Sequence, residues 1–75
     1  MDPRHVVHSH PEICGGTPVF VGTRVPLQNL VDHLAGGDSI DEFVRQFPSV
    51  TREQAQAAVE LAMEALEARI GVVRA

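Results

Sequence analysis

Apolar residues recur at helical spacing from Pro26 onward. In the first such segment, the positions that share one face are Leu27, Leu30, Val31 and Leu34. Pro26 suits the first residue of a helix, where its missing N–H costs nothing, and the following Gly36-Gly37 pair supplies a stop. The pattern predicts a helix between Pro26 and Gly36 that turns one face toward a core.

Two further helices, Ser39–Phe47 and Thr51–Ile70, are predicted from their capping signals. The first begins with an S-x-x-E capping box and the second with a T-x-x-Q box. Pro48 ends the first helix, because the residue before a proline is pushed out of the α region. The apolar positions of the longer helix are Ala55, Ala58, Val59, Ala62, Met63, Leu66 and Ile70. Two capped helices joined by a short proline-containing turn predict a helix-turn-helix unit.

The helical period is missing from residues 1–25, which hold prolines, glycines and short β-branched runs. Short strands are predicted at His5–His8 and Pro18–Val21, with a turn at Gly15-Gly16 and a possible continuation at Arg24-Val25. Because such short strands are not stable alone, they are expected to pack on the helices or on another chain. The prediction is a single domain over residues 1–75, with strands and a Gly-rich turn in 1–25 and a three-helix body in 26–75.

Chain length and cysteine usage favour an assembly. A 75-residue domain buries only about 60% of its unfolded surface, and the lone Cys14 excludes an internal disulfide, which fits a reducing compartment. The long helix also carries apolar residues away from its main stripe, at Leu61, Ala65 and Ala68. We therefore expect a homodimer. No apolar stretch approaches the ~20 residues of a membrane span, and no signal peptide is recognisable, so the prediction is a cytoplasmic protein.

Charge limits the function classes. Six arginines and no lysine face ten acids, which gives a net charge of −4. Such a balance argues against a protein whose whole surface binds nucleic acid. Any DNA binding would need its arginines gathered on one face.

A longer pattern runs along most of the chain. Its segments are His10-Pro11-Glu12-Ile13, Gly15-Gly16, Pro18-Val19, Gly22-Thr23-Arg24, Leu34-Ala35-Gly36, Ser39 and Phe47-Pro48-Ser49-Val50-Thr51. In this order and spacing they resemble the small bacterial family catalogued as domain of unknown function four-three-three (DUF433). The resemblance covers roughly His8 to Met63. The family usually has basic residues where this chain has Thr17 and Val21, so positive charge is lost from the Gly-rich segment.

The resemblance implies a mainly α fold, a three-helix homeodomain-like or winged helix-turn-helix with short N-terminal β-strands. It also implies an antitoxin of the VapB type, which binds a PIN-like nuclease toxin and represses transcription of its own operon by binding operator DNA. The family therefore supplies expectations for both the fold and the partners.

Candidate DNA-binding residues follow from the helix-turn-helix prediction. The second helix of such a unit reads the major groove with its first turns, which here present Arg52, Gln54 and Gln56; Arg45 lies on the preceding helix. Arginine can pair with guanine and glutamine with adenine. The alternative is that any capped surface helix carries such residues in its first turns.

Arg24 is a candidate contact for a phosphate or for a carboxylate of the toxin, since a guanidinium binds either group with two hydrogen bonds. The alternative, which we favour, is a structural role in an ion pair or in capping nearby carbonyls. The glycines around Arg24 are explained by turns, because no nucleotide-binding loop motif occurs.

Metal binding and catalysis are not expected. The N-terminal His5, His8, His10 and Cys14 contain no C-x-x-C or H-x-x-x-H pair. His33 has no serine or cysteine partner at a recognisable spacing, and the acids Glu60, Glu64 and Glu67 are predicted to be solvated. We predict no cofactor and no enzymatic activity.

Two functional hypotheses remain. The first is a dimeric antitoxin-like protein that binds operator DNA and a nuclease-like toxin. The second is a protein-interaction module of the same fold that does not bind DNA.

Overall fold

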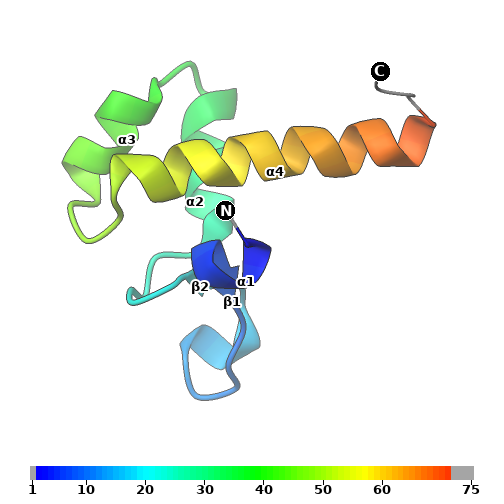
Figure 1. The fold of residues 1–75 in the computed structure, drawn as a ribbon. Coiled ribbons are helices and arrows are strands. Elements are labelled where there is room, and N and C mark those ends of the chain that lie inside the picture. Colours follow the sequence, from blue (N-terminus) through cyan, green and yellow to red (C-terminus); the bar gives the residue numbers. More distant parts are fainter. Residues whose placement is uncertain (1, 72–75) are drawn as a thin grey trace.

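The computed structural model describes residues 2–71 (Figure 1). The elements in chain order are α1 (Pro3–Val6), β1 (Val7–His8), the 3₁₀ turn η1 (Cys14–Gly16), β2 (Val19–Phe20), α2 (Leu27–Ala35), α3 (Ile40–Gln46) and α4 (Arg52–Ile70). Strands β1 and β2 form a two-stranded antiparallel sheet. The prediction of a mainly helical protein with short N-terminal strands is confirmed.

The predicted strand at His5–His8 is wrong in its first half. Residues Pro3–Val6 form one helical turn, because the Asp2 side chain accepts a hydrogen bond from the Arg4 N–H at 2.8 Å and Pro3 supplies a helical φ. Extended structure begins only at Val7, which pairs with Phe20, while His8 pairs with Val19.

The connection from β2 to α2 is a tight turn. The Phe20 carbonyl accepts hydrogen bonds from the N–H and the hydroxyl of Thr23, at 3.0 and 2.8 Å. Gly22 has a φ of +80°, a conformation that favours glycine. The chain then returns beside β2, where Val19 forms an isolated bridge with Pro26. The predicted continuation of the strand at Arg24-Val25 is therefore limited to backbone contacts next to β2.

Helices α2 and α3 begin one residue later than predicted. Pro26 has an extended backbone and precedes α2 as its N-cap instead of forming its first turn. Ser39 caps α3 by accepting a hydrogen bond from the Glu42 N–H at 3.1 Å. The carboxylate of Glu42 is engaged along α3, where it binds Arg45 and accepts a hydrogen bond from Gln46.

Helix α4 begins at the predicted capping box. The Thr51 hydroxyl accepts from the Gln54 N–H at 3.0 Å, and the Gln54 side chain accepts from the Thr51 N–H at 3.0 Å. The helix has 19 residues, about 28 Å at ~1.5 Å each, and ends at Gly71 in a left-handed conformation.

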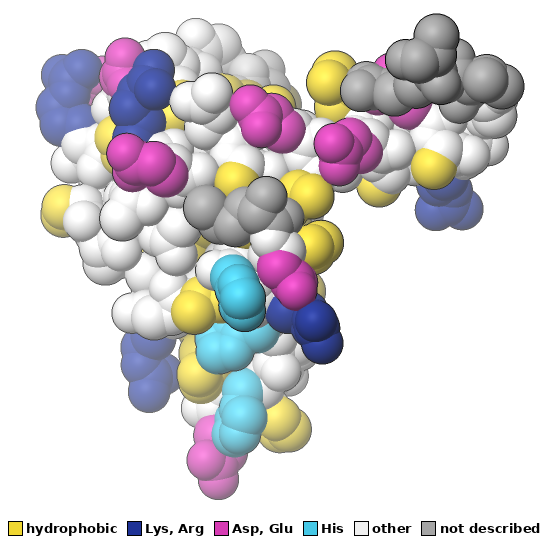
Figure 2. Space-filling model, in the orientation of Figure 1, with side chains coloured by type: hydrophobic (Ala, Val, Ile, Leu, Met, Phe, Trp, Pro, Cys, Tyr) yellow, Lys and Arg dark blue, Asp and Glu magenta, His cyan; other side chains and the backbone are white. Residues whose placement is uncertain are grey.

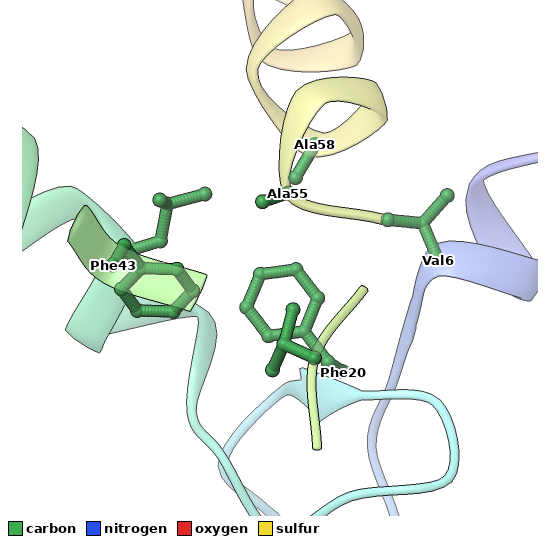
Figure 3. Close-up of a cluster of buried hydrophobic side chains, with 7 residues drawn as sticks. Val6, Phe20, Phe43, Ala55 and Ala58 are labelled. Carbon is green, nitrogen blue, oxygen red and sulfur yellow. The ribbon is translucent and has the colours of Figure 1, made fainter. Parts of the chain in front are cut away.

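The core lies where both halves of the chain meet. Phe20 is fully buried and faces Phe43 across a centroid distance of 6.1 Å, with Val6 and the small residues Ala55 and Ala58 of α4 around it (Figure 3). Val6 and Phe20 come from residues 1–25, so this segment contributes to the same core as the helices. The sheet is therefore covered within the chain itself.

The second half of α4 extends beyond this core (Figure 1). The buried residues of α4 are Ala55 and Ala58, in its first two turns. The predicted apolar face of the helix is therefore only partly a core face, because its larger side chains are exposed: Val59 by 37%, Met63 by 52%, Leu66 by 64% and Ile70 by 70%. Val31 of α2, which was also predicted to face the core, is 50% exposed. Among residues 2–71, no helix has the length and apolar content to cross a bilayer.

Candidate functional site

The candidate DNA-binding residues at the α3–α4 turn are engaged by their own chain. Arg52 donates to Asp41 of α3 at 2.7 Å and to Gln56 at 3.2 Å. The hydrogen bond to Asp41 raises the pKa of Arg52. Gln56 in turn donates to Glu60 at 3.3 Å. The structure thus places Arg52 and Gln56 side by side, with acids on both sides of them.

Gln54 has a structural position. Its side-chain oxygen completes the capping box, and its side-chain nitrogen donates to the Val21 carbonyl at 3.0 Å. The oxygen thus closes the start of α4, and the nitrogen holds α4 against the turn after β2. A base contact by Gln54 would require these bonds to break.

Arg45 lies on α3 and binds Glu42, one turn earlier, at 2.6 Å. Its side chain is 73% exposed. An exposed pair of this kind contributes little to stability, so Arg45 can exchange partners at low cost.

Arg24 lines a surface hollow of about 560 Å³. The other lining residues are His8, Ile13, Gly22, Thr23 and Ser49. Among residues 2–71, Arg24 makes no ion pair, and no hydrogen bond from its guanidinium to a carbonyl is found. The favoured structural role of Arg24 is therefore not seen in this part of the chain, and its contact with a phosphate or partner stays a prediction.

His33 is held in a structural contact at the end of α2. Its Nδ1 lies 2.8 Å from a carboxylate oxygen of Asp38. Its ring meets Phe43 and Phe47 edge-on, at centroid distances of 5.6 and 5.5 Å. These contacts tie α2 to α3. Within residues 2–71, no group of three or more His, Cys, Asp or Glu residues is arranged to hold a metal ion.

A groove of about 450 Å³ lies between α2 and α4. Its lining is entirely apolar and consists of Leu27, Leu30, Val31, Leu34, Ala35, Ala58, Val59 and Ala62. Val59 lines this α2–α4 groove and also begins a row of exposed apolar side chains along α4. We call this row the apolar stripe; it consists of Val59, Met63, Leu66 and Ile70. Along α4, hydrophobic and acidic side chains both lie at the surface (Figure 2).

A second hollow, of about 360 Å³, borders α4 and has a polar character. It is lined by Glu53, Gln56, Ala57, Glu60, Leu61 and Glu64. We call it the acidic hollow.

The sequence pattern of the family described as protein of unknown function (DUF433) matches residues 7–62. The chain belongs to this family. It is also 41% identical over 51 residues to the uncharacterized protein y4eO of Sinorhizobium fredii (strain NBRC 101917 / NGR234). The match covers 68% of the chain and 23% of that relative, so the chain spans less than two thirds of the relative's length. No solved structure matches the chain.

The sequence predicted that the long helix of this DUF433 protein carries apolar residues that need cover, and it assigned that role to a second copy of the chain. The 4-3-4 spacing of Val59, Met63, Leu66 and Ile70 predicts a helix face, but it does not say what covers that face. The lengths of the helices explain why this face stays exposed. α2 and α3 have 9 and 7 residues against the 19 of α4, so they cannot cover it along its whole length.

Proposed function

We propose that this DUF433 protein is an antitoxin-like protein-binding module, which holds a nuclease-like toxin through the second half of α4. The observation that carries the proposal is the apolar stripe together with the α2–α4 groove. A contiguous apolar surface bordered by polar residues is typical of a protein interface. The net charge of −4 and the internal engagement of Arg52 and Gln54 also favour a protein partner over DNA.

Co-expression with the product of the reading frame adjacent to its gene tests the proposal. We expect a complex that survives purification, and we expect Leu66→Ser to weaken it at least tenfold, because Leu66 is an exposed part of the apolar stripe. Ala68→Ser, on another face of the same helix, is the matched control and should leave the affinity unchanged. If the purified adjacent product does not bind, or binds the two variants equally well, the proposed use of α4 is wrong.

Operator binding is the second candidate function. It is favoured by the exposure of Arg45 and Arg52, whose side chains are 73% and 57% exposed at the α3–α4 turn. In the helix-turn-helix interpretation these guanidinium groups exchange Glu42 and Asp41 for DNA phosphates. A salt-sensitive mobility shift on the upstream region of the gene at micromolar protein, abolished in Arg45→Gln/Arg52→Gln, would support this function. If no shift is seen, operator binding is wrong and protein binding is the candidate function that stands.

A further inference from the structure

We propose that the apolar stripe and the α2–α4 groove receive an amphipathic helix of the partner that carries basic residues along one edge. The inference rests on the proposed function and adds the chemistry of the partner surface to it. The reasons are the spacing of the stripe, the shape of the groove and the charge along the border of the stripe.

The spacing of the stripe indicates a helical occupant. Val59, Met63, Leu66 and Ile70 follow each other at intervals of four, three and four residues, which is the seam of a helix that packs against a second helix. The seam runs over the twelve residues from Val59 to Ile70, or about 17 Å, which three turns of a partner helix can match. The groove beside it lies between two helices, an arrangement that takes up amphipathic helices in other peptide-binding proteins.

The charge next to the stripe indicates which helix fits. Residues three and four apart are neighbours on a helix, so Met63 has Val59 and Leu66 on one side and Glu60 and Glu67 on the other. Beyond this border lies the acidic hollow, which contains Glu60 and Glu64. Among residues 2–71, neither Glu60 nor Glu64 is in an ion pair with an arginine. A row of lysines or arginines on the partner helix would face these carboxylates.

A second copy of the chain fits this surface poorly. It would bring the same glutamates to the same border in an antiparallel arrangement, and like charges placed opposite each other oppose association. The chain has no lysine, and Arg45 and Arg52 are paired with acids at the other end of α4. Arg69, in the last turn of α4, lies on the side of the stripe opposite Glu60 and Glu67, so in the antiparallel arrangement it does not face these glutamates. We therefore assign the basic edge to a different protein.

Two labelled synthetic peptides of about 18 residues test the inference. Both carry the same leucine seam, and their edge positions are lysine in one and glutamate in the other. Fluorescence anisotropy at low salt should show at least tenfold tighter binding of the lysine peptide, and the difference should shrink at high salt because the charges are screened. Glu64→Gln should reduce the ratio of the two affinities, which is the advantage of the lysine peptide, several-fold. Glu12→Gln removes an equal charge from a loop away from α4 and should leave the advantage unchanged.

Leu66→Ser separates this inference from simple charge attraction. It should abolish binding of both peptides, with an unchanged circular dichroism spectrum because Leu66 is exposed. Equal affinities for the two peptides, no binding of either, or lysine-peptide binding that survives Leu66→Ser would each overturn the inference. So would a dimer in sedimentation that Leu66→Ser dissociates. If the adjacent gene product binds and Glu64→Gln has no effect, the basic edge is wrong while the proposed function stands.

Discussion

Gln54 joins two parts of the chain that lie 33 residues apart. The spacing of Thr51 and Gln54 predicted the capping box, which the structure confirms. The spacing could not predict the bond to the Val21 carbonyl, because that contact depends on where the turn after β2 comes to rest. The same limit applies to Arg52, whose partner Asp41 lies on another helix. A residue type near a helix start thus indicates chemistry, while its availability depends on tertiary contacts.

Replacing Gln54 tests its structural role. Gln54→Ala removes two hydrogen bonds and should lower the free energy of unfolding by about 1–3 kcal/mol. Gln54→Glu keeps the acceptor of the capping box and loses the donor to Val21, so it should cost less than Gln54→Ala. Urea unfolding monitored by circular dichroism measures both. Gln56→Ala, on the exposed surface two residues later, is the control and should change stability by less than about 0.5 kcal/mol. Equal effects at positions 54 and 56 would contradict this assignment.

The cap of α1 should depend on acid. The pKa of Asp2 is held below its ordinary value of 3.8 by hydrogen bonds from Arg4. The bond from the Arg4 side chain has the larger effect, and the bond from its backbone N–H the smaller. Because the pKa is lowered in the folded chain, the stabilising contribution is complete above the ordinary value and is lost as pH falls through the lowered one. The amide proton of Arg4 should therefore shift in NMR spectra below pH 3.8. In Asp2→Asn this shift should be absent, and its persistence there would assign it to another group.

Helices α2, α3 and α4 were predicted to within one or two residues, since their caps and stops are local signals. The N-terminal turn was missed, because short β-branched runs such as Val6-Val7 are compatible with a strand while Asp2-Pro3 favours a helical start. The length of α4 did indicate that part of it extends beyond the other helices, but helical periodicity does not show which of its apolar residues the rest of the chain covers. Helices that carry capping and stop residues can thus be predicted from the sequence. Which of their faces are buried is harder to predict, because burial depends on tertiary contacts.

The two halves of α4 should differ in stability. Ala55 and Ala58 are packed in the core, whereas Met63, Leu66 and Ile70 are exposed, so the second half gains much less stability from burial. Amide hydrogen exchange in the isolated protein should be at least tenfold faster from residue 64 to 70 than from residue 55 to 61. Addition of the partner should slow the exchange of residues 64–70 selectively. Uniform protection along α4 in the free protein at low concentration would contradict this view.

At the scale of the whole molecule, the chain depends on its first 25 residues. A 75-residue protein has little core, and the fully buried Val6, Val19 and Phe20 all come from this segment. Phe20 lies between Phe43 and the alanines of α4, so its removal opens the centre of the core (Figure 3). The helices contribute Leu30, Phe43 and Val50 to the same core, so removing the first 25 residues would leave this core open on one side.

A fragment of residues 26–75 should accordingly fail to fold. Its amide NMR spectrum should be poorly dispersed and its thermal unfolding should show no cooperative transition, although some helical circular dichroism can remain. In the full chain, Phe20→Ala should cost about 3–5 kcal/mol, the range for a buried phenylalanine, which is comparable with the whole stability of a domain this small. Val31→Ala, at a half-exposed position of α2, is the control and should cost much less. A well-dispersed spectrum from residues 26–75 would instead show that the helices form an independent domain and that the N-terminal segment is an addition to it.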